Sequence, residues 1–193
     1  EDAVQIAERS SDDLAVPIAR MTLGNALVHR QTDAERDRGQ KLLAEARDAL
    51  LRRGHGLSEL RLVNVYVARE RAGRGDRDEA IPVMRAAVDH LFREGQLVAV
   101  GWGIPATGVL VETLLDRGAD SDVAEAEAAI ERLASAPADE GLVIRDIWLL
   151  RLRALLARAH GDAAAYAHFR DRYRDMARSL GFEGHIAWAE AMP

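Results

Sequence analysis

The sequence contains no cysteine among its 193 residues. Disulfides, thiolate metal sites and cysteine nucleophiles are therefore excluded. No stretch reaches the roughly 18 consecutive apolar residues that a membrane-spanning helix needs. No signal-peptide pattern opens the chain either. These absences lead us to expect a soluble protein of the cytoplasm that does not interact with a membrane.

Lysine is almost absent as well, because Lys41 is the single lysine among 26 basic residues. We interpret the excess of arginine and alanine as the composition of a high-G+C genome rather than as a functional feature. The formal net charge is -6 and the isoelectric point is about 5.6. Binding to a phosphate backbone depends on clustered basic residues, so nucleic acid is a poor candidate partner.

The composition that remains is that of a folded protein, with 48% hydrophobic and 30% charged residues. Disordered chains combine low hydrophobicity with high net charge, which is not the case here. The length suits one substantial core or a short array of helix pairs. We therefore predict a single domain over residues 1–193.

Amphipathic helices recur in pairs along the whole chain. The second helices of the pairs are spaced somewhat more widely than the repeat of about 34 residues in tetratricopeptide (TPR) proteins, but within the range of helical repeats. Four hairpins are predicted, over residues 12–54, 57–94, 97–135 and 141–181, followed by a capping helix over about 184–192. Residues 1–9 are interpreted as part of a truncated preceding hairpin.

Local signals mark where the helices begin and end. Thr32 and Glu35 form a predicted capping box at the start of a helix over 33–53, and Gly54 is its predicted left-handed terminator. Asp76 and Glu79 form a second predicted capping box. Since each hairpin has one apolar stripe that it cannot bury alone, the stripes must be buried by stacking. The predicted fold class is all-α, a right-handed α-α superhelix of TPR-like hairpins.

Two segments resemble known families. Residues 75–81 (GDRDEAI), followed by Met84 and Ala87, resemble the tetratricopeptide pattern, as does the pair Leu23-Gly24. In that family, small side chains allow paired helices to approach closely.

The second segment, residues 177–192 (ARSLGFEGHIAWAEAM), resembles the end of large mycobacterial and other actinobacterial signalling proteins. These include class III adenylate cyclases and LuxR-type regulators. The resemblance implies a catalytic or DNA-binding module and an ATP-binding ATPase elsewhere in a parent protein, with this chain inside the helical array. It leaves the choice between a cyclase and a transcriptional regulator open.

Motifs for catalysis and cofactor binding are not found in the sequence. There is no Walker sequence before Lys41, no Gly-x-Ser-x-Gly and no His-Glu-x-x-His. We interpret the carboxylate pairs Asp12-Asp13 and Asp139-Glu140 as residues that favour helix N-termini. The six histidines are scattered, and we expect most of them at the surface or at hairpin ends. We therefore expect no catalytic residue, no cofactor and no metal site in this chain.

A binding groove is the remaining candidate site. In stacked hairpins the first helix of each pair lines the inner surface, which selects Asn25, Arg69, Glu112, Trp148 and Arg151. Arginine and tryptophan are frequent in interface hot spots. The alternatives are that Trp148 is buried in the core and that the arginines cover a solvated face.

The leading hypothesis from the sequence is a regulatory domain that binds another protein or another domain of its own parent. A small-molecule or peptide effector that controls an attached ATPase is the alternative. Self-association to a homo-oligomer also remains open, because the end of a truncated array exposes apolar surface.

Overall fold

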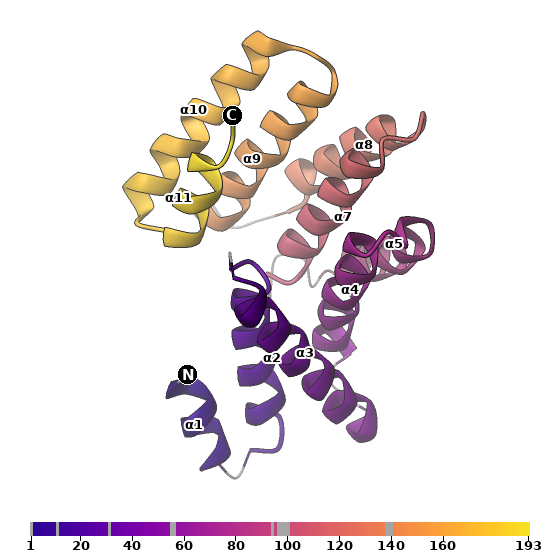
Figure 1. Ribbon diagram of the computed structural model, residues 1–193, viewed down its shortest axis with the longest axis vertical. Helices are drawn as coiled ribbons and strands as arrows, with labels where there is room; N and C mark the ends of the chain where they lie inside the picture. The colour runs from indigo at the N-terminus through magenta and orange to yellow at the C-terminus, as the bar shows by residue number, and fades with distance from the viewer. Residues whose placement is uncertain are drawn as a thin grey trace. The chain divides into compact units, whose positions relative to one another are not determined.

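The computed structural model describes residues 2–10, 12–30, 32–54, 57–93, 95, 101–137 and 141–193, with only the backbone of Leu57. Over these ranges the regular structure consists of ten α-helices without a strand. The predicted all-α class is thus confirmed (Figure 1). The helices form two compact units, over residues 1–93 and 94–193. Each unit is described by itself below, and the single domain over 1–193 stays a prediction.

The first unit contains two helix pairs and a short leading helix. The most extensive contacts join α2 to α3 and α4 to α5, while α3 and α4 connect the two pairs. The bounds are α1 Asp2–Glu8, α2 Ala15–Leu27, α3 Asp33–Arg53, α4 Leu57–Gly73 and α5 Arg77–Arg93.

The second unit contains two further pairs and a short final helix. Here α7 packs on α8 and α9 on α10, α9 also contacts α7 and α8, and α11 lies on α10. The bounds are α7 Gly103–Arg117, α8 Asp122–Ser135, α9 Val143–Ala159, α10 Ala163–Leu180 and α11 Glu183–Glu190.

Helix bounds predicted from the sequence agree closely where capping residues are strong. The helix over 33–53 has the predicted bounds, while the first helix of that hairpin begins at Ala15 rather than at 12. The predicted beginning of the third hairpin at 97 and the pair Asp139-Glu140 lie outside the described residues. The final helix begins and ends slightly earlier than predicted.

The capping signals at α3 act as local chemistry requires. The Thr32 hydroxyl accepts a hydrogen bond from the backbone N–H of Glu35 at 3.3 Å, and Gly54 ends the helix at φ 69°. Asp76 and Glu79 are used differently from the predicted box. Both carboxylates accept hydrogen bonds from Arg71, at 2.5 and 2.7 Å, so Arg71 ties the end of α4 to the start of α5.

Close approach of helices at glycine occurs in both units. In the first unit α2 crosses α3 at Gly24 and Gly39, and a Cβ on Gly39 would lie 2.9 Å from the carbonyl oxygen of Gly24. In the second unit a Cβ on Gly108 would overlap the ring of Trp148.

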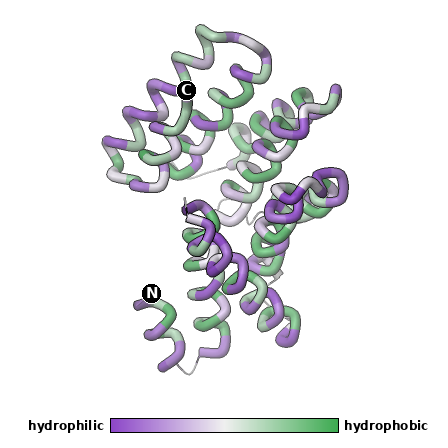
Figure 2. Tube along the Cα trace, viewed as in Figure 1, coloured by the Kyte–Doolittle hydropathy of each residue, from purple (hydrophilic) through white to green (hydrophobic). Residues whose placement is uncertain are grey.

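The core of the second unit is organised around α7 and α9. Hydrophobic residues predominate along α7 (Figure 2), and most of them are buried. Leu114 and Leu133 are fully buried, as are Ile147 and Tyr173 from the following pair. No helix among the described residues is long and apolar enough to cross a membrane.

Candidate functional site

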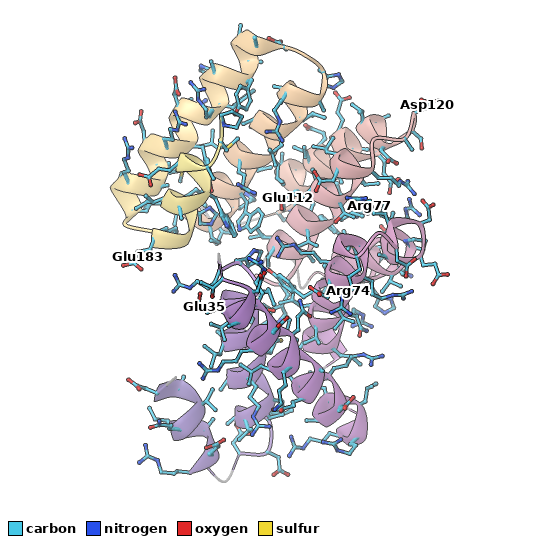
Figure 3. All side chains as sticks on the ribbon, viewed as in Figure 1. Glu35, Arg74, Arg77, Glu112, Asp120 and Glu183 are labelled. Carbon is cyan, nitrogen blue, oxygen red and sulfur yellow. The ribbon has the colours of Figure 1, made fainter. Side chains whose placement is uncertain are left out.

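The five groove candidates fall into the two units. Glu112 on α7 and Trp148 and Arg151 on α9 come together in the second unit. Asn25 and Arg69 belong to the first unit. Figure 3 labels Glu112 on its helix. The second unit therefore provides the candidate site that can be built from contacts.

A partly buried ion pair forms the centre of this site. Arg151 Nε donates a hydrogen bond to Glu112 Oε1 at 2.9 Å, and the two side chains are only 13% and 19% exposed. Burial disfavours the charged guanidinium, but the Glu112 carboxylate and Tyr173 outweigh this effect and raise the pKa of Arg151. Arg151 is thus a fixed cation, and its charge is balanced by Glu112.

Tyr173 extends the ion pair into a polar chain. Its hydroxyl interacts electrostatically with the Arg151 guanidinium and lies 2.8 Å from His185 Nδ1. Burial raises the pKa of Tyr173 to about 12. Burial, together with the Arg151 charge, lowers the pKa of His185 to about 4. The Nδ1 of a neutral His185 can accept a hydrogen bond from the Tyr173 hydroxyl. The row of polar side chains therefore extends from Glu112 on α7 to His185 on α11.

Aromatic rings from α9 and α11 lie next to these polar side chains. The guanidinium of Arg151 lies 4.7 Å from the centre of the Trp188 ring, within the range of a cation–π contact. Trp188 also meets Trp148 edge to face at 5.6 Å and His185 at 5.1 Å. Trp188 therefore anchors the final helix on α9.

Trp148 itself is a core residue. It is 5% exposed, and its ring packs against Gly108 and contacts the Trp188 ring edge to face. The groove position considered for Trp148 is wrong, and the alternative of core burial is confirmed. Its contribution to the site is to hold the Trp188 ring in position next to Arg151.

A pocket of about 280 Å³ opens beside the ion pair, between α7 and α9. Leu115, Leu155 and Ala159 supply its apolar part, next to Glu112 and Arg151. The pocket lies on the surface that the first helices of two consecutive pairs share. Glu112 and Arg151, two of the groove candidates, border this pocket, and a binding role for it stays a prediction.

Two further charges lie on the rim of this pocket. Asp116 and Arg158 also line it, and both are exposed. Within residues 101–137 and 141–193 the structure describes no ion pair for either side chain. A bound segment can pair with these rim charges, whereas Glu112 and Arg151 already neutralise each other. Recognition of a complementary charge pair around an apolar anchor is the chemistry that this arrangement allows.

The first unit holds a smaller polar cluster. Arg69 Nη1 lies 3.1 Å from His29 Nδ1, and the other ring nitrogen of His29 lies 3.3 Å from the hydroxyl of the buried Tyr66. Asn25 has a buried Oδ1 without a hydrogen-bond partner in the described part of the chain. Arg69 is thus half-buried against its neighbours rather than free to face a partner.

Sequence reasoning selected Glu112 and Arg151 as separate groove candidates, without their pairing, and it missed Tyr173 and His185. Tyr173 and His185 come from helices that were not considered for the groove. Most histidines were expected at the surface or at hairpin ends, whereas His185 is only 8% exposed. The available signal was their position in the sequence. Tyr173 lies one helix turn before Ala177, where the family-like segment begins, and His185 lies within that segment. A single sequence does not show that these side chains face Arg151.

Neither metal-ligand clusters nor relatives add to this picture. The described residues contain no group of three or more metal-ligating side chains that could hold a metal ion. Comparisons with protein families, with curated proteins and with solved structures found no match for this chain.

Proposed function

We propose that the chain is a non-catalytic protein-interaction and regulatory domain, built as a right-handed TPR-like superhelix. One observation carries this proposal: a pocket with two exposed rim charges lies on the surface shared by α7 and α9, the first helices of consecutive pairs. Stacked helical repeats present extended surfaces of this kind to their partners.

The partner is a segment of another protein or of another domain in the same parent. An acidic side chain of that segment pairs with Arg158, a basic one pairs with Asp116, and an apolar side chain enters the pocket beside Leu155. Such exposed ion pairs contribute little affinity individually and mainly select the partner.

The parent we propose is a bacterial multidomain signalling protein, either an adenylate cyclase or a LuxR-type transcriptional regulator with an ATPase module. The support is the resemblance of residues 177–192. His185 and Trp188 within this segment hold α11 against α9. The segment therefore has a physical role as the cap of the array, whichever output module the parent carries.

Deletion of residues 1–193 from the intact parent tests the interaction role. The output activity of the parent and its assembly, measured by sedimentation, should both change when the domain is removed. Unchanged activity and unchanged assembly would refute the proposal. Turnover of ATP by the isolated chain would refute its non-catalytic character.

A second candidate function is sensing of a small molecule or peptide that controls the attached ATPase. The pocket between α7 and α9 motivates it, because its volume of about 280 Å³ comes close to the lower end of small-molecule sites, at roughly 300 Å³. A ligand that binds only the folded chain raises its melting temperature. A thermal-shift screen of metabolites and short peptides therefore separates the two functions. A hit that is lost in Arg158→Glu would favour sensing, and the absence of hits would favour the protein partner.

A further inference from the structure

A second hollow lies on a different side of the second unit, outside the pocket between α7 and α9. This groove has a volume of about 430 Å³ and is bounded by α8 and α10, the second helices of their pairs, with α9 between them. None of its lining residues lines the first pocket.

The floor of the groove is apolar. Ile130 and Ala157 are buried in it, and Leu156, Ala165 and Phe169 are half-buried along it. The Phe169 ring and the methyl groups of Leu156 and Ala165 therefore remain partly in contact with water. An apolar side chain that covered them would gain the free energy of burying this surface.

The rim of the groove is acidic. Glu127 and Glu131 lie one turn apart on α8, both are exposed, and Asp162 lies at the start of α10. One Asp162 oxygen accepts the backbone N–H of Ala165 at 2.9 Å. Over residues 101–137 and 141–193 no ion pair is described for Glu127 or Glu131.

One guanidinium, that of Arg153, lies among the described lining residues, and no ion pair is described for it. Three carboxylates thus outnumber a single arginine around an apolar floor. An anionic lipid headgroup or a nucleic acid would meet this rim with the wrong charge. A cationic partner with an apolar face is complementary to both the floor and the rim.

We propose that the groove between α8 and α10 docks a cationic amphipathic helix of a protein partner. An aliphatic or aromatic side chain of that helix covers Phe169 and Leu156, and its Lys or Arg residues face Glu127 and Glu131. Helix recognition of this kind uses apolar anchors at helical spacing, with flanking charges setting the orientation. This site is independent of the proposed binding at the first pocket.

The test uses the 193-residue chain and two defined fluorescent peptides. One is a short helical peptide of Leu, Ala and Lys with its leucines on one face, and the other has Glu in place of every Lys. Anisotropy titration should show saturable binding of the cationic peptide, weaker at high ionic strength. The Glu-containing peptide should not bind.

Charge variants of the rim give the sharper comparison. Glu127→Gln with Glu131→Gln should weaken binding of the cationic peptide about fivefold to tenfold, because two exposed charge pairs are lost. Arg153→Gln should strengthen binding, an opposite change that a loss of folding would not produce. The matched control Asp175→Asn with Glu183→Gln removes two exposed carboxylates elsewhere in the same unit and should leave the affinity unchanged.

Several results would overturn this proposal: no saturable binding of the cationic peptide, equal binding of the Glu-containing peptide, or equal affinities of the rim and control variants. Self-association that the rim variants abolish would show instead that a second copy of the chain covers the groove. Arg158→Glu in the first pocket should leave peptide affinity intact. Failure of one site is therefore distinguishable from failure of the other.

Discussion

Gly108 is the residue of α7 against which the Trp148 ring of α9 packs directly. A Cβ there would lie only 2.6 Å from Trp148 Cε3, and the Trp148 ring is enclosed by the core and by Trp188. Gly108→Ala must therefore displace the ring or separate the helices. Overpacking of this kind costs about 1–3 kcal/mol of unfolding free energy. Urea unfolding followed by circular dichroism measures this cost.

Gly73→Ala is the matched control for that substitution. A Cβ on Gly73 meets nothing within 4 Å, so the variant should be as stable as the original chain or slightly more stable. If Gly108→Ala and Gly73→Ala had the same stability, the described packing of Trp148 on α7 would be contradicted.

His185 makes stability depend on pH in a defined window. Its folded pKa of about 4 lies below its unfolded value of 6.5, so the unfolded chain binds the proton first as the pH falls. The stabilisation is therefore complete above pH 6.5 and is lost progressively down to about pH 4. Between about pH 7 and pH 4.5 the unfolding free energy should fall by about 2 kcal/mol from this group alone.

His185→Asn retains an acceptor for the Tyr173 hydroxyl but does not titrate. Its stability should therefore fall less steeply over the same pH window than that of the original chain. Urea unfolding at a series of pH values provides the comparison. Parallel curves for His185→Asn and the original chain would show that His185 is not buried as described.

At the scale of elements, the sequence predicts most of what local chemistry determines. Thr32, Gly54 and Gly181 are capping and terminating residues, and the helices next to them have nearly the predicted bounds. The side chains around Arg151 could not be predicted in this way, because Tyr173 and His185 come near it only through the packing of α10 and α11. The periodicity of the sequence does not show which side chains of α10 and α11 face Arg151. Glu112 and Arg151 were therefore selected without the residues around them.

Pro82 is an irregularity within an element that the hairpin pattern did not anticipate. It lies in the sixth position of α5, where it cannot donate the usual hydrogen bond to the residue four positions earlier, and it is exposed. A proline in a helix interior is less favourable than alanine by about 3 kcal/mol. Pro82→Ala should therefore raise the melting temperature measured by circular dichroism.

Pro105→Ala is the control, because Pro105 is another helical proline of the same chain. Pro105 lies in the third position of α7, where the backbone N–H has no acceptor within the helix, so the substitution should have little effect. A melting temperature that rises equally in both variants would show that the position in the helix is not the cause.

At the scale of the molecule, two compact units each bury their own core, and the second unit offers two separate surfaces. The pocket between α7 and α9 carries mixed charges, and the groove between α8 and α10 carries mainly acidic ones. From the order of helices in each pair, the sequence selected Glu112 and Arg151, which border the first surface. It did not predict the second, because the hollow arises only where α8 and α10 both pack around α9.

The most direct test of the central claim is the output activity of the intact parent when the pocket rim is inverted by Arg158→Glu with Asp116→Arg. Both side chains are exposed, so the fold should be retained, which circular dichroism verifies. The control Arg172→Glu with Asp175→Arg inverts two exposed charges on α10. We predict that the rim variant changes regulation or assembly of the parent while the control does not. Equal behaviour of rim variant, control and original protein would contradict a binding role for this pocket.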